Sequence, residues 1–192
     1  MKTFEIKGTR RSSITKQEVK SLRNSGKVPC VLYGGDEQIH FSAETANFKG
    51  LIYTPEVYMV KIYVDGTEYM ATLQDVQFHP VNDAINHVDF LQVFKDKPVT
   101  MSIPVRTTGA SEGVKMGGKL VLKARRLKIR GISSTLPDAI NVDISGLKIG
   151  NTIRVKDLKI DGVEIMDSPS NVIVSVNMTR NVAADAVAEK GK

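Results

Sequence analysis

The stretch VYMVKIYVDGTEYMATL, residues 57–73, is the clearest structural signal in this chain of 192 residues. On a strand, one face would hold Val57, Met59, Lys61 and Tyr63, and the other would hold Tyr58, Val60, Ile62 and Val64. Asp65-Gly66 follows, and then a second run of β-forming residues. An Asp-Gly pair between two such runs is typical of a tight β-hairpin turn. We therefore predict antiparallel strands at Val57–Val64 and Glu68–Leu73, with residues 74–79 extending the second strand or bending away from it.

The rest of the first half adds strands and short helices around this hairpin. Alternating or apolar β-rich runs predict strands at Thr3–Lys7, Val28–Tyr33, Ile39–Ser42 and His87–Phe94. Apolar residues at helical spacing, with helix-breaking residues behind them, predict helices at Lys16–Ser25 and Ala43–Tyr53. The expected fold is an α+β domain with about six strands in a barrel-like sheet and two short helices.

The pattern changes after Lys95-Asp96-Lys97-Pro98, where short strands begin to dominate. Turn-forming clusters separate six predicted strands: Val99–Arg106, Gly118–Ile129, Ile140–Ile144, Thr152–Val155, Val163–Ile165 and Val172–Met178. Strands at this spacing predict a mainly-β C-terminal domain, either a sandwich or an open barrel. We therefore expect a first domain at residues 1–94, a linker at 95–98, a second domain at 99–178 and a disordered tail at 179–192.

Charge is distributed unevenly along the first domain. Residues 1–30 hold eight Lys or Arg and two Glu, a net charge of +6, whereas residues 31–95 hold three Lys and nine acids, a net charge of −6. Such asymmetry is typical of a surface that docks on phosphates. Lys16, Lys20 and Arg23 would share one face of the first helix. The alternative is a solvated basic face without a ligand.

Composition excludes several classes of protein. The hydrophobic content of 41% allows a packed core, and the single cysteine, Cys30, cannot form an internal disulfide, which indicates a reducing compartment. The N-terminus lacks the apolar run of a signal peptide, and no run approaches the roughly 18 residues of a membrane span. We expect a cytoplasmic protein without a membrane partner, and the net charge of +6 favours nucleic acid as its ligand.

No motif supports catalysis or metal binding. Residues 113–120 nearly match a phosphate-binding loop, but Leu120 replaces the required Ser or Thr, and a strand is predicted where the motif needs a helix. None of the three histidines has a partner at zinc-ligand spacing. We predict that the protein is not an enzyme and holds neither a metal nor a cofactor. A phosphate-handling enzyme built on this loop would lose nucleotide binding when Lys119 is replaced by alanine.

The stretch QDVQFHPVNDAINHVDF, residues 74–90, carries a second concentration of polar groups. His87 and Asp89 would share one face of a strand, while Val88 and Phe90 point to the core. An imidazole beside a carboxylate can donate and accept hydrogen bonds at a base edge or a ribose hydroxyl. The alternative is a polar strand face with a satisfied histidine.

Short motifs in both halves together resemble a known family. In the first half they are GKVP (26–29), VLYG (31–34), QDVQ (74–77), His79-Pro80 and HVDF (87–90). This half resembles ribosomal protein twenty-five of the bacterial large subunit, and the resemblance implies binding of 5S ribosomal RNA. In the second half, LP (136–137), INVDIS (140–145), Leu147, Ile149-Gly150 and Asp157-Leu158 resemble the C-terminal β domain of the family's long, general-stress (CTC) form.

The resemblance also implies which residues contact RNA. Carried over by position, the set is Arg10, Lys16, Lys20, Arg23, Tyr33, Gln74, Gln77, His87 and Asp89. Arg11 joins this set because of its charge. The Lys and Arg side chains would position the protein on phosphates, and the others would recognise the shape and edges of a shallow RNA minor groove.

The expected function is that of a structural constituent of the large ribosomal subunit that binds 5S ribosomal RNA through its first domain. Neighbouring ribosomal proteins are further expected partners, through the C-terminal domain, and the protein off the ribosome is expected to be a monomer. The alternative is a free RNA-binding stress factor that meets ribosomes only transiently. Sedimentation of ribosomes through high salt distinguishes the two.

A second basic stretch lies in the C-terminal half. Seven Lys or Arg and no acid occur between Lys115 and Arg130, and cations that repel one another are tolerated best beside a polyanion. We predict a second, weaker ribosomal RNA surface there, formed by Lys123, Arg125, Lys128 and Arg130. On a single strand the first two would project together, with a bulge at Arg125-Arg126 before the second two. The alternative is an ordinary solvated face.

Overall fold

The computed structural model of the protein describes residues 1–35, 37–160 and 162–179. The chain divides into two compact units: unit 1 is Met1–Met101 with Ile132–Asp138, and unit 2 is Ser102–Gly131 with the chain from Ala139 on. Residues 93–98, which include the predicted linker, contain neither a helix nor a strand. The segment Ile132–Asp138 is grouped with unit 1, although the sequence pattern assigned it to the second domain. All of the predicted tail except Thr179 lies outside the described residues.

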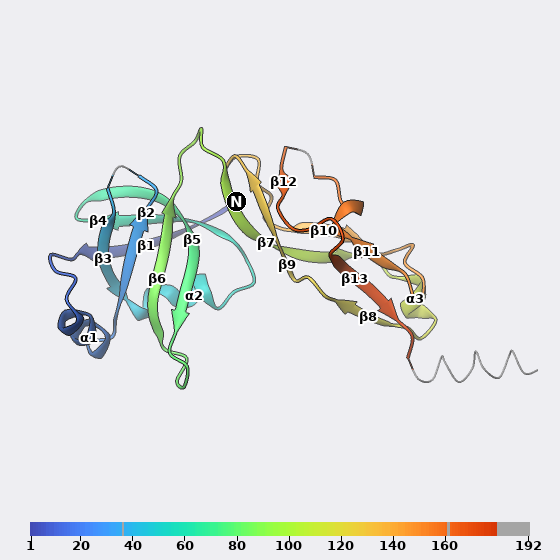
Figure 1. Cartoon of the computed structure of the whole chain (residues 1–192), viewed down its shortest axis with the longest axis horizontal. Helices are drawn as coiled ribbons and strands as arrows, with labels where there is room; N and C mark the ends of the chain where they lie inside the picture. The colour runs from blue at the N-terminus through green and yellow to red at the C-terminus, as the bar shows by residue number, and fades with distance from the viewer. Residues whose placement is uncertain (36, 161, 180–192) are drawn as a thin grey trace, which may run out of the picture. The chain divides into compact units, whose positions relative to one another are not determined.

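Six strands of unit 1 form a closed barrel (Figure 1). Around the barrel they are β1 (Lys2–Arg10), β3 (Ile39–Glu44), β2 (Lys27–Tyr33), β6 (Ile85–Gln92), β5 (Thr67–Phe78) and β4 (Tyr58–Val64). β1 runs parallel to β4 and β2 runs parallel to β6, whereas the other neighbours are antiparallel. The predicted α+β domain with a barrel-like sheet of six strands is confirmed.

The predicted hairpin is β4 and β5, which are paired from Met59↔Thr72 to Val64↔Thr67. Asp65 and Gly66 have φ angles of 48° and 86°. Two successive residues with positive φ make the turn that matches the twist of antiparallel strands, and glycine adopts this conformation without steric cost. The hairpin therefore forms where the Asp-Gly pair predicted it.

Strand alternation decides which side chains fill the barrel. On β6, Val88 and Phe90 are fully buried, whereas His87 and Asp89 are only partly buried on the outer face. The Phe90 ring packs against that of Phe41 on β3, with 6.0 Å between the ring centroids. Burial of each such side chain contributes about 1.5–3 kcal/mol. The core thus holds the outer face of β6 in a fixed position.

Two short helical segments accompany the barrel, and the second differs from its prediction. α1 (Lys16–Asn24) ends where Gly26 takes a φ of 76°, as the glycine predicted. A helix was predicted at Ala43–Tyr53, but β3 continues to Glu44, and only a 3-10 turn (η1, Thr45–Phe48) and one α-helical turn (α2, Lys49–Ile52) follow. Ala43 stays in the sheet because it pairs with β2, while Phe48 and Leu51 insert into the core from the helical turns.

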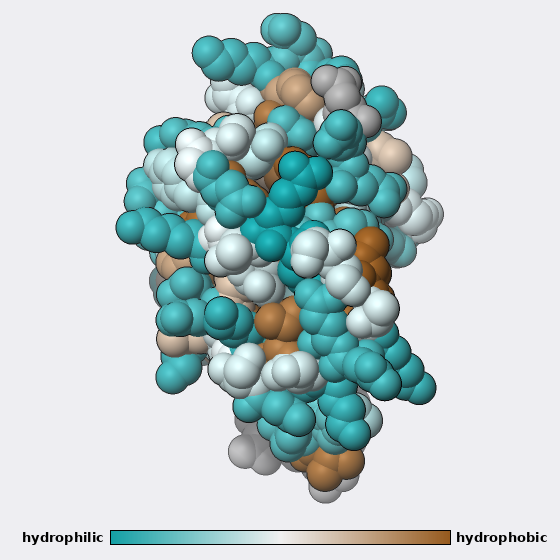
Figure 2. All heavy atoms as spheres, turned by 90° about the vertical axis from the view of Figure 1, so that its left-hand side faces the viewer, coloured by the Kyte–Doolittle hydropathy of each residue, from teal (hydrophilic) through white to brown (hydrophobic). Residues whose placement is uncertain are grey.

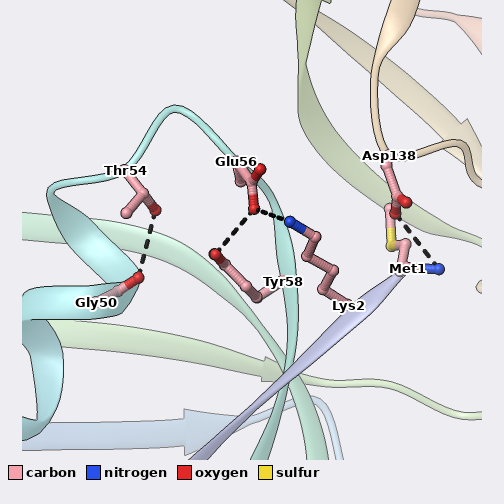
Figure 3. Close-up of polar contacts among 7 residues, drawn as sticks. All are labelled: Met1, Lys2, Gly50, Thr54, Glu56, Tyr58 and Asp138. Carbon is pink, nitrogen blue, oxygen red and sulfur yellow. Dashed lines mark hydrogen bonds and ion pairs between the residues drawn. The ribbon is translucent and has the colours of Figure 1, made fainter.

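A polar cluster fastens the start of β1 to β4 (Figure 3). Glu56 Oε2 accepts hydrogen bonds from Lys2 Nζ at 2.6 Å and from the Tyr58 hydroxyl at 3.0 Å. These hydrogen bonds raise the pKa of both the Lys2 ammonium and the Tyr58 phenol. The Met1 ammonium lies 3.4 Å from Asp138 Oδ1, an ion pair within unit 1.

Unit 2 consists mainly of two small sheets. The first contains β10 (Ile140–Asp143), β7 (Val99–Thr108), β9 (Arg126–Gly131) and β12 (Glu164–Ile165), in that order. The second contains β11 (Thr152–Arg154), β13 (Val172–Asn177) and β8 (Lys119–Leu122). Two single turns complete the described part of the unit, α3 (Glu112–Lys115) and η2 (Val155–Asp157). The prediction of a mainly-β second part is confirmed.

The single strand predicted at Gly118–Ile129 is wrong, because the chain bends at residues 123–125 and passes from one sheet to the other. The backbone N–H groups of Lys123 and Ala124 donate to the Ile173 carbonyl at 2.8 and 3.2 Å, while the Arg125 carbonyl accepts from Val105 at 2.9 Å. The bulge predicted at Arg125-Arg126 is therefore the passage between two strands, β8 and β9.

The buried cysteine gives a testable dependence of stability on pH. Burial raises the pKa of the Cys30 thiol, and the negative charge of Asp89 raises it further. The folded protein therefore keeps a neutral thiol, while an unfolded chain ionises above about pH 8.5. Stability from this group is complete below that pH and is lost as pH rises, by roughly 2 kcal/mol at about pH 10.

Urea unfolding at neutral pH and at pH 10 checks this expectation. The parent should lose more unfolding free energy between the two conditions than a Cys30→Ala variant does. The variant keeps Tyr33 and Tyr58, whose raised pKa values act in the same direction in both proteins. Equal losses in parent and variant would mean that the Cys30 thiol ionises in the folded protein as readily as in the unfolded chain.

Candidate nucleic-acid interface

The outer face of β2, β6 and β5 brings several of the predicted RNA-contacting residues into neighbouring rows. Asp89 on β6 lies opposite Val31 on β2 and opposite Asp75 on β5, and His87 lies opposite Gln77. Side chains of directly opposed residues project on the same face within about 5 Å of each other. We call the set Tyr33, Asp75, Gln77, His87 and Asp89 the polar row. Sequence reasoning missed Asp75, because the pairing of β5 with β6 is visible only in the structure.

The centre of the polar row is a close contact between an imidazole and a carboxylate. His87 Nδ1 lies 2.6 Å from Asp89 Oδ1, and the two side chains are 25% and 29% exposed. The contact is an ion pair only when the imidazole is protonated. Asp89 Oδ1 is buried against this imidazole, and the like charge of Asp75 lies directly opposite. Two opposed carboxylates destabilise a strand pair, so a hydrogen-bond donor or a cation that approaches the polar row would stabilise it.

Tyr33, the last residue of β2, is the member of the polar row that this strand contributes. Its partial burial raises the pKa of the phenol, and the negative charges of Asp89 and Asp75 raise it further. The hydroxyl group is therefore firmly protonated at neutral pH and can donate a hydrogen bond. An aromatic ring with a donor at its tip suits contact with a ribose or a base.

α1 places cations next to the row. Lys16 and Lys20 are exposed on this helix, which has no buried residue and only nine residues in all. A helix this short is marginal by itself, so it needs tertiary anchors. Arg23 provides one, because its Nε and Nη2 atoms donate to the Asn86 carbonyl at 3.1 and 3.0 Å. This hydrogen-bonded fork joins α1 to β6 at the residue before His87.

The other two predicted arginines are Arg10, the last residue of β1, and Arg11, the first residue of the loop that leads to α1. Arg10 Nη2 lies 3.7 Å from Glu37 Oε2, and both side chains are largely exposed. The backbone N–H of Arg11 donates to the His40 carbonyl at 2.9 Å, and its Nη2 donates to the Ser13 carbonyl at 3.1 Å. Arg10 thus has a weakly held side chain, whereas Arg11 partly serves to shape its own loop.

Gln74 is separated from the row by an irregularity in β5. The pairing steps from Leu73↔Phe90 to Asp75↔Asp89, so Gln74 is an extra residue with no partner of its own on β6. A β-bulge of this kind turns one side chain away from the regular alternation. The Gln74 amide instead donates to the Thr100 carbonyl at 3.4 Å. A role at RNA would require this hydrogen bond to be exchanged.

Buried polar atoms without partners concentrate in the same segments. Within the described part of unit 1, Arg11 Nε and Glu18 Oε2 are buried and have no hydrogen-bond partner. Such atoms are rare in folded proteins and indicate a site that a ligand or an ordered water completes. They belong to the loop before α1 and to α1. Glu18 is a further residue of this region that the sequence pattern did not single out.

The barrel face with α1 is covered mostly by hydrophilic residues, among which hydrophobic ones are scattered (Figure 2). An open groove of about 300 Å³ lies where β1, β2 and β3 meet; its lining residues are Lys7, Gly8, Thr9, Lys27, Ser42, Ala43, Glu44 and Asn47. Lys7 and Lys27 extend the cationic character of the face beyond the predicted set. The groove is polar and open, which suits a backbone passing over it better than an enclosed small molecule.

Two further features of the described residues bear on other classes of function. No group of three or more His, Cys, Asp or Glu side chains in the described part of the chain could hold a metal ion. Nor does any described helix combine the length and the apolar character needed to cross a membrane. The glycine-rich loop at residues 113–120 leads into β8 and not into a helix, so it lacks the geometry of a phosphate-binding loop.

The four residues of the predicted second surface fall into two groups. Lys128 and Arg130 lie at alternate exposed positions of β9, on the face opposite the buried Leu127 and Ile129, as predicted. Lys123 and Arg125 are exposed as well, but they lie in the bend between β8 and β9. The two groups therefore do not form one face of a single strand.

The closed barrel thus presents cations beside a polar row on one set of strands. Residues 6–90 match the ribosomal L25p family, and residues 98–180 match the C-terminal domain of ribosomal protein TL5. The chain belongs to the ribosomal L25p family, in a form with the TL5-type C-terminal domain. The family consists of ribosomal proteins and not of enzymes, which confirms that prediction.

Three similar relatives are each named large ribosomal subunit protein bL25. The one from Bacteroides fragilis is 42% identical, and the match covers the whole of both chains. That from Amoebophilus asiaticus is 45% identical over all of this chain and 98% of its own. That from Christiangramia forsetii is 47% identical over 95% of this chain and 84% of its own. The two-part organisation is thus shared along nearly the full length.

Proposed function

We propose that this protein is a structural component of the large ribosomal subunit and that unit 1 binds 5S ribosomal RNA. The observation that carries the proposal is the polar row on β2, β5 and β6 beside the cationic helix α1, all fixed to one closed barrel. The names of the relatives, large ribosomal subunit proteins, support the ribosomal part of the proposal. The protein would then work in the cytoplasm as part of the ribosome, and as a monomer when it is free.

The proposed contacts divide by chemistry. The cations beside the polar row would lie on phosphates and fix the position of the RNA. They are Arg10, Arg11, Lys16 and Lys20. Tyr33, Gln77, His87 and Asp89 would meet ribose hydroxyls and base edges in a wide, shallow minor groove. Arg23 already binds the Asn86 carbonyl, and Gln74 already binds the Thr100 carbonyl, so each would act at RNA only beside or in exchange for that bond.

A footprint of the full chain on 5S RNA tests the proposal. We expect protection of ribose positions along one duplex minor groove and of the phosphates on both sides of it. Absence of any protected segment at protein concentrations that saturate bulk RNA would contradict it. Sedimentation through high salt addresses the competing hypothesis, since a stress factor that binds only transiently would leave the large subunit under conditions in which a structural component remains.

We also expect residues 1–94 to fold and to bind 5S RNA without the rest of the chain. All six barrel strands lie within Lys2–Gln92, and every proposed 5S contact precedes Lys95. The measurement compares the fragment with the full chain by circular dichroism and by filter binding. A fragment that folds but fails to bind, while the full chain binds, would show that the 5S site needs residues of the second half.

A further inference from the structure

We infer that unit 2 carries its own docking surface for an RNA sugar–phosphate backbone, formed by β9 and by the bend that precedes it. The surface, which we call the β9 surface, consists of Lys123, Arg125, Lys128 and Arg130. The inference rests on the proposed ribosomal function for its setting, because a ribosome supplies the RNA. It differs from the 5S proposal in the residues involved, in the unit that carries them and in the RNA that they contact.

The β9 strand presents its charges in a line. Leu127 and Ile129 are 1% and 0% exposed, so the alternate residues Lys128 and Arg130 project to the opposite, solvated side. Alternate residues of a strand are about 6–7 Å apart. A straight row of cations on one face of a rigid sheet can follow an extended polyanion without reordering, which lowers the entropic cost of binding.

The bend holds the other two cations on fixed backbone. Lys123 and Ala124 both donate to the Ile173 carbonyl, and the Arg125 carbonyl accepts from Val105. These bonds tie the bend to one strand of each sheet, β13 and β7. Lys123 and Arg125 therefore extend the β9 surface from an ordered segment that both sheets support.

Internal partners leave most of this charge uncompensated. None of the four cations forms an ion pair with a described residue. Asp167 Oδ2 accepts from the backbone N–H of Lys128 at 2.7 Å, which places one acid beside the strand, although in no ion pair with a described cation of the β9 surface. Glu164 lies opposite Arg130 in the ladder, and it is the nearest acid along β12. The region from Lys115 to Arg130 still carries seven cations without one acid, a repulsion that an RNA backbone would relieve.

Two variants of the full chain test the inference. In the first, the four residues of the β9 surface are replaced as Lys123→Gln, Arg125→Gln, Lys128→Gln and Arg130→Gln. In the control, four exposed cations elsewhere in unit 2 are replaced as Lys148→Gln, Arg154→Gln, Lys156→Gln and Lys159→Gln. Both variants lose four positive charges, so any effect of net charge alone is the same in the two.

The expected result is specific to the β9 variant. Both variants should unfold at the same temperature as the parent and bind isolated 5S RNA within about twofold of it. The β9 variant alone should leave large subunits at a lower salt concentration. Its binding to protein-free large-subunit RNA should also show a smaller salt slope, by up to about 0.7–0.9 per lost phosphate contact.

Other outcomes would overturn the inference. Equal salt release from parent, control and β9 variant would mean a solvated face. Equal loss in both variants would mean a net-charge effect. Loss of retention on subunits with unchanged binding to protein-free RNA would identify an acidic protein as the partner. If neither parent nor variants bind 5S RNA, the proposed 5S function fails, while the comparison on large-subunit RNA still tests the β9 surface.

Discussion

Replacement of His87 with alanine is expected to weaken binding to 5S RNA by on the order of 1–3 kcal/mol, by analogy with base readout. Binding to unrelated RNA should change little. The reason is that His87 lies in the polar row, 2.6 Å from Asp89 and opposite Gln77, where it can act only on a ligand that fits this row. Its removal also leaves the Asp89 carboxylate opposite Asp75 without the imidazole that lies beside it.

Arg10→Ala should behave differently, which makes it the matched comparison. Arg10 is exposed at the end of β1 and only loosely paired with Glu37, so it is expected to meet a phosphate. Its loss should lower the salt slope by about one unit and weaken binding to every RNA to a similar extent. Lys49→Ala on α2 serves as a control for the loss of one exposed charge. Equal losses on both kinds of RNA for His87→Ala and Arg10→Ala would contradict the division of roles.

Arg23→Lys should weaken RNA binding although it conserves the charge. The Arg23 guanidinium donates two hydrogen bonds to the Asn86 carbonyl and thereby fixes α1 beside His87. A lysine cannot reproduce this planar fork, so the short helix should loosen. We expect faster amide hydrogen exchange in α1 of the free protein. We also expect roughly tenfold weaker 5S binding, equivalent to about 1.4 kcal/mol, with the salt slope unchanged.

Lys20→Ala on the same helix is the control for this prediction. Lys20 is exposed, so its loss should lower the salt slope but leave hydrogen exchange in α1 as it is in the parent. The contrary outcome is that the Arg23→Lys variant shows the same hydrogen exchange in α1 and the same 5S RNA affinity as the parent. If Arg23→Ala then lowers the salt slope, Arg23 is a simple phosphate contact. Hydrogen exchange is measured without RNA, so it reports on the anchor independently of the 5S proposal.

Local patterns in the sequence were sufficient for the barrel strands and for the direction of their side chains. The Asp65-Gly66 turn and the alternation through Val88-Asp89-Phe90 depend only on neighbouring residues, and both predictions agree with the structure. The strand expected at Gly118–Ile129 failed for a physical reason. Sheet membership is decided by distant partners, here Ile173 for the bend and Val105 for its far side. No periodicity within the stretch records those partners.

The candidate site shows the same limit. The sequence pattern placed His87 and Asp89 on one face, because strand alternation requires it. It could not show that Asp75 opposes Asp89 or that Gln74 bulges out of the ladder, since both depend on how β5 is aligned with β6. Nor could it show that Arg23 binds a carbonyl 63 positions away. The roles of these residues at RNA remain predictions, and the substitutions above address them.

The order in which the barrel strands pair also constrains when the polar row can form during synthesis of the chain. β1 is made first, yet its long parallel partner is β4, which ends at Val64, and β2 must wait for β6, which ends at Gln92. Contacts between segments so distant in sequence form slowly, because closing the long intervening loop costs entropy before the contacts compensate for it. The carbonyl of Asn86 that anchors α1 emerges in the same final segment. A nascent chain therefore carries α1 without its Asn86 anchor until β6 has left the exit tunnel, and only then can the polar row form.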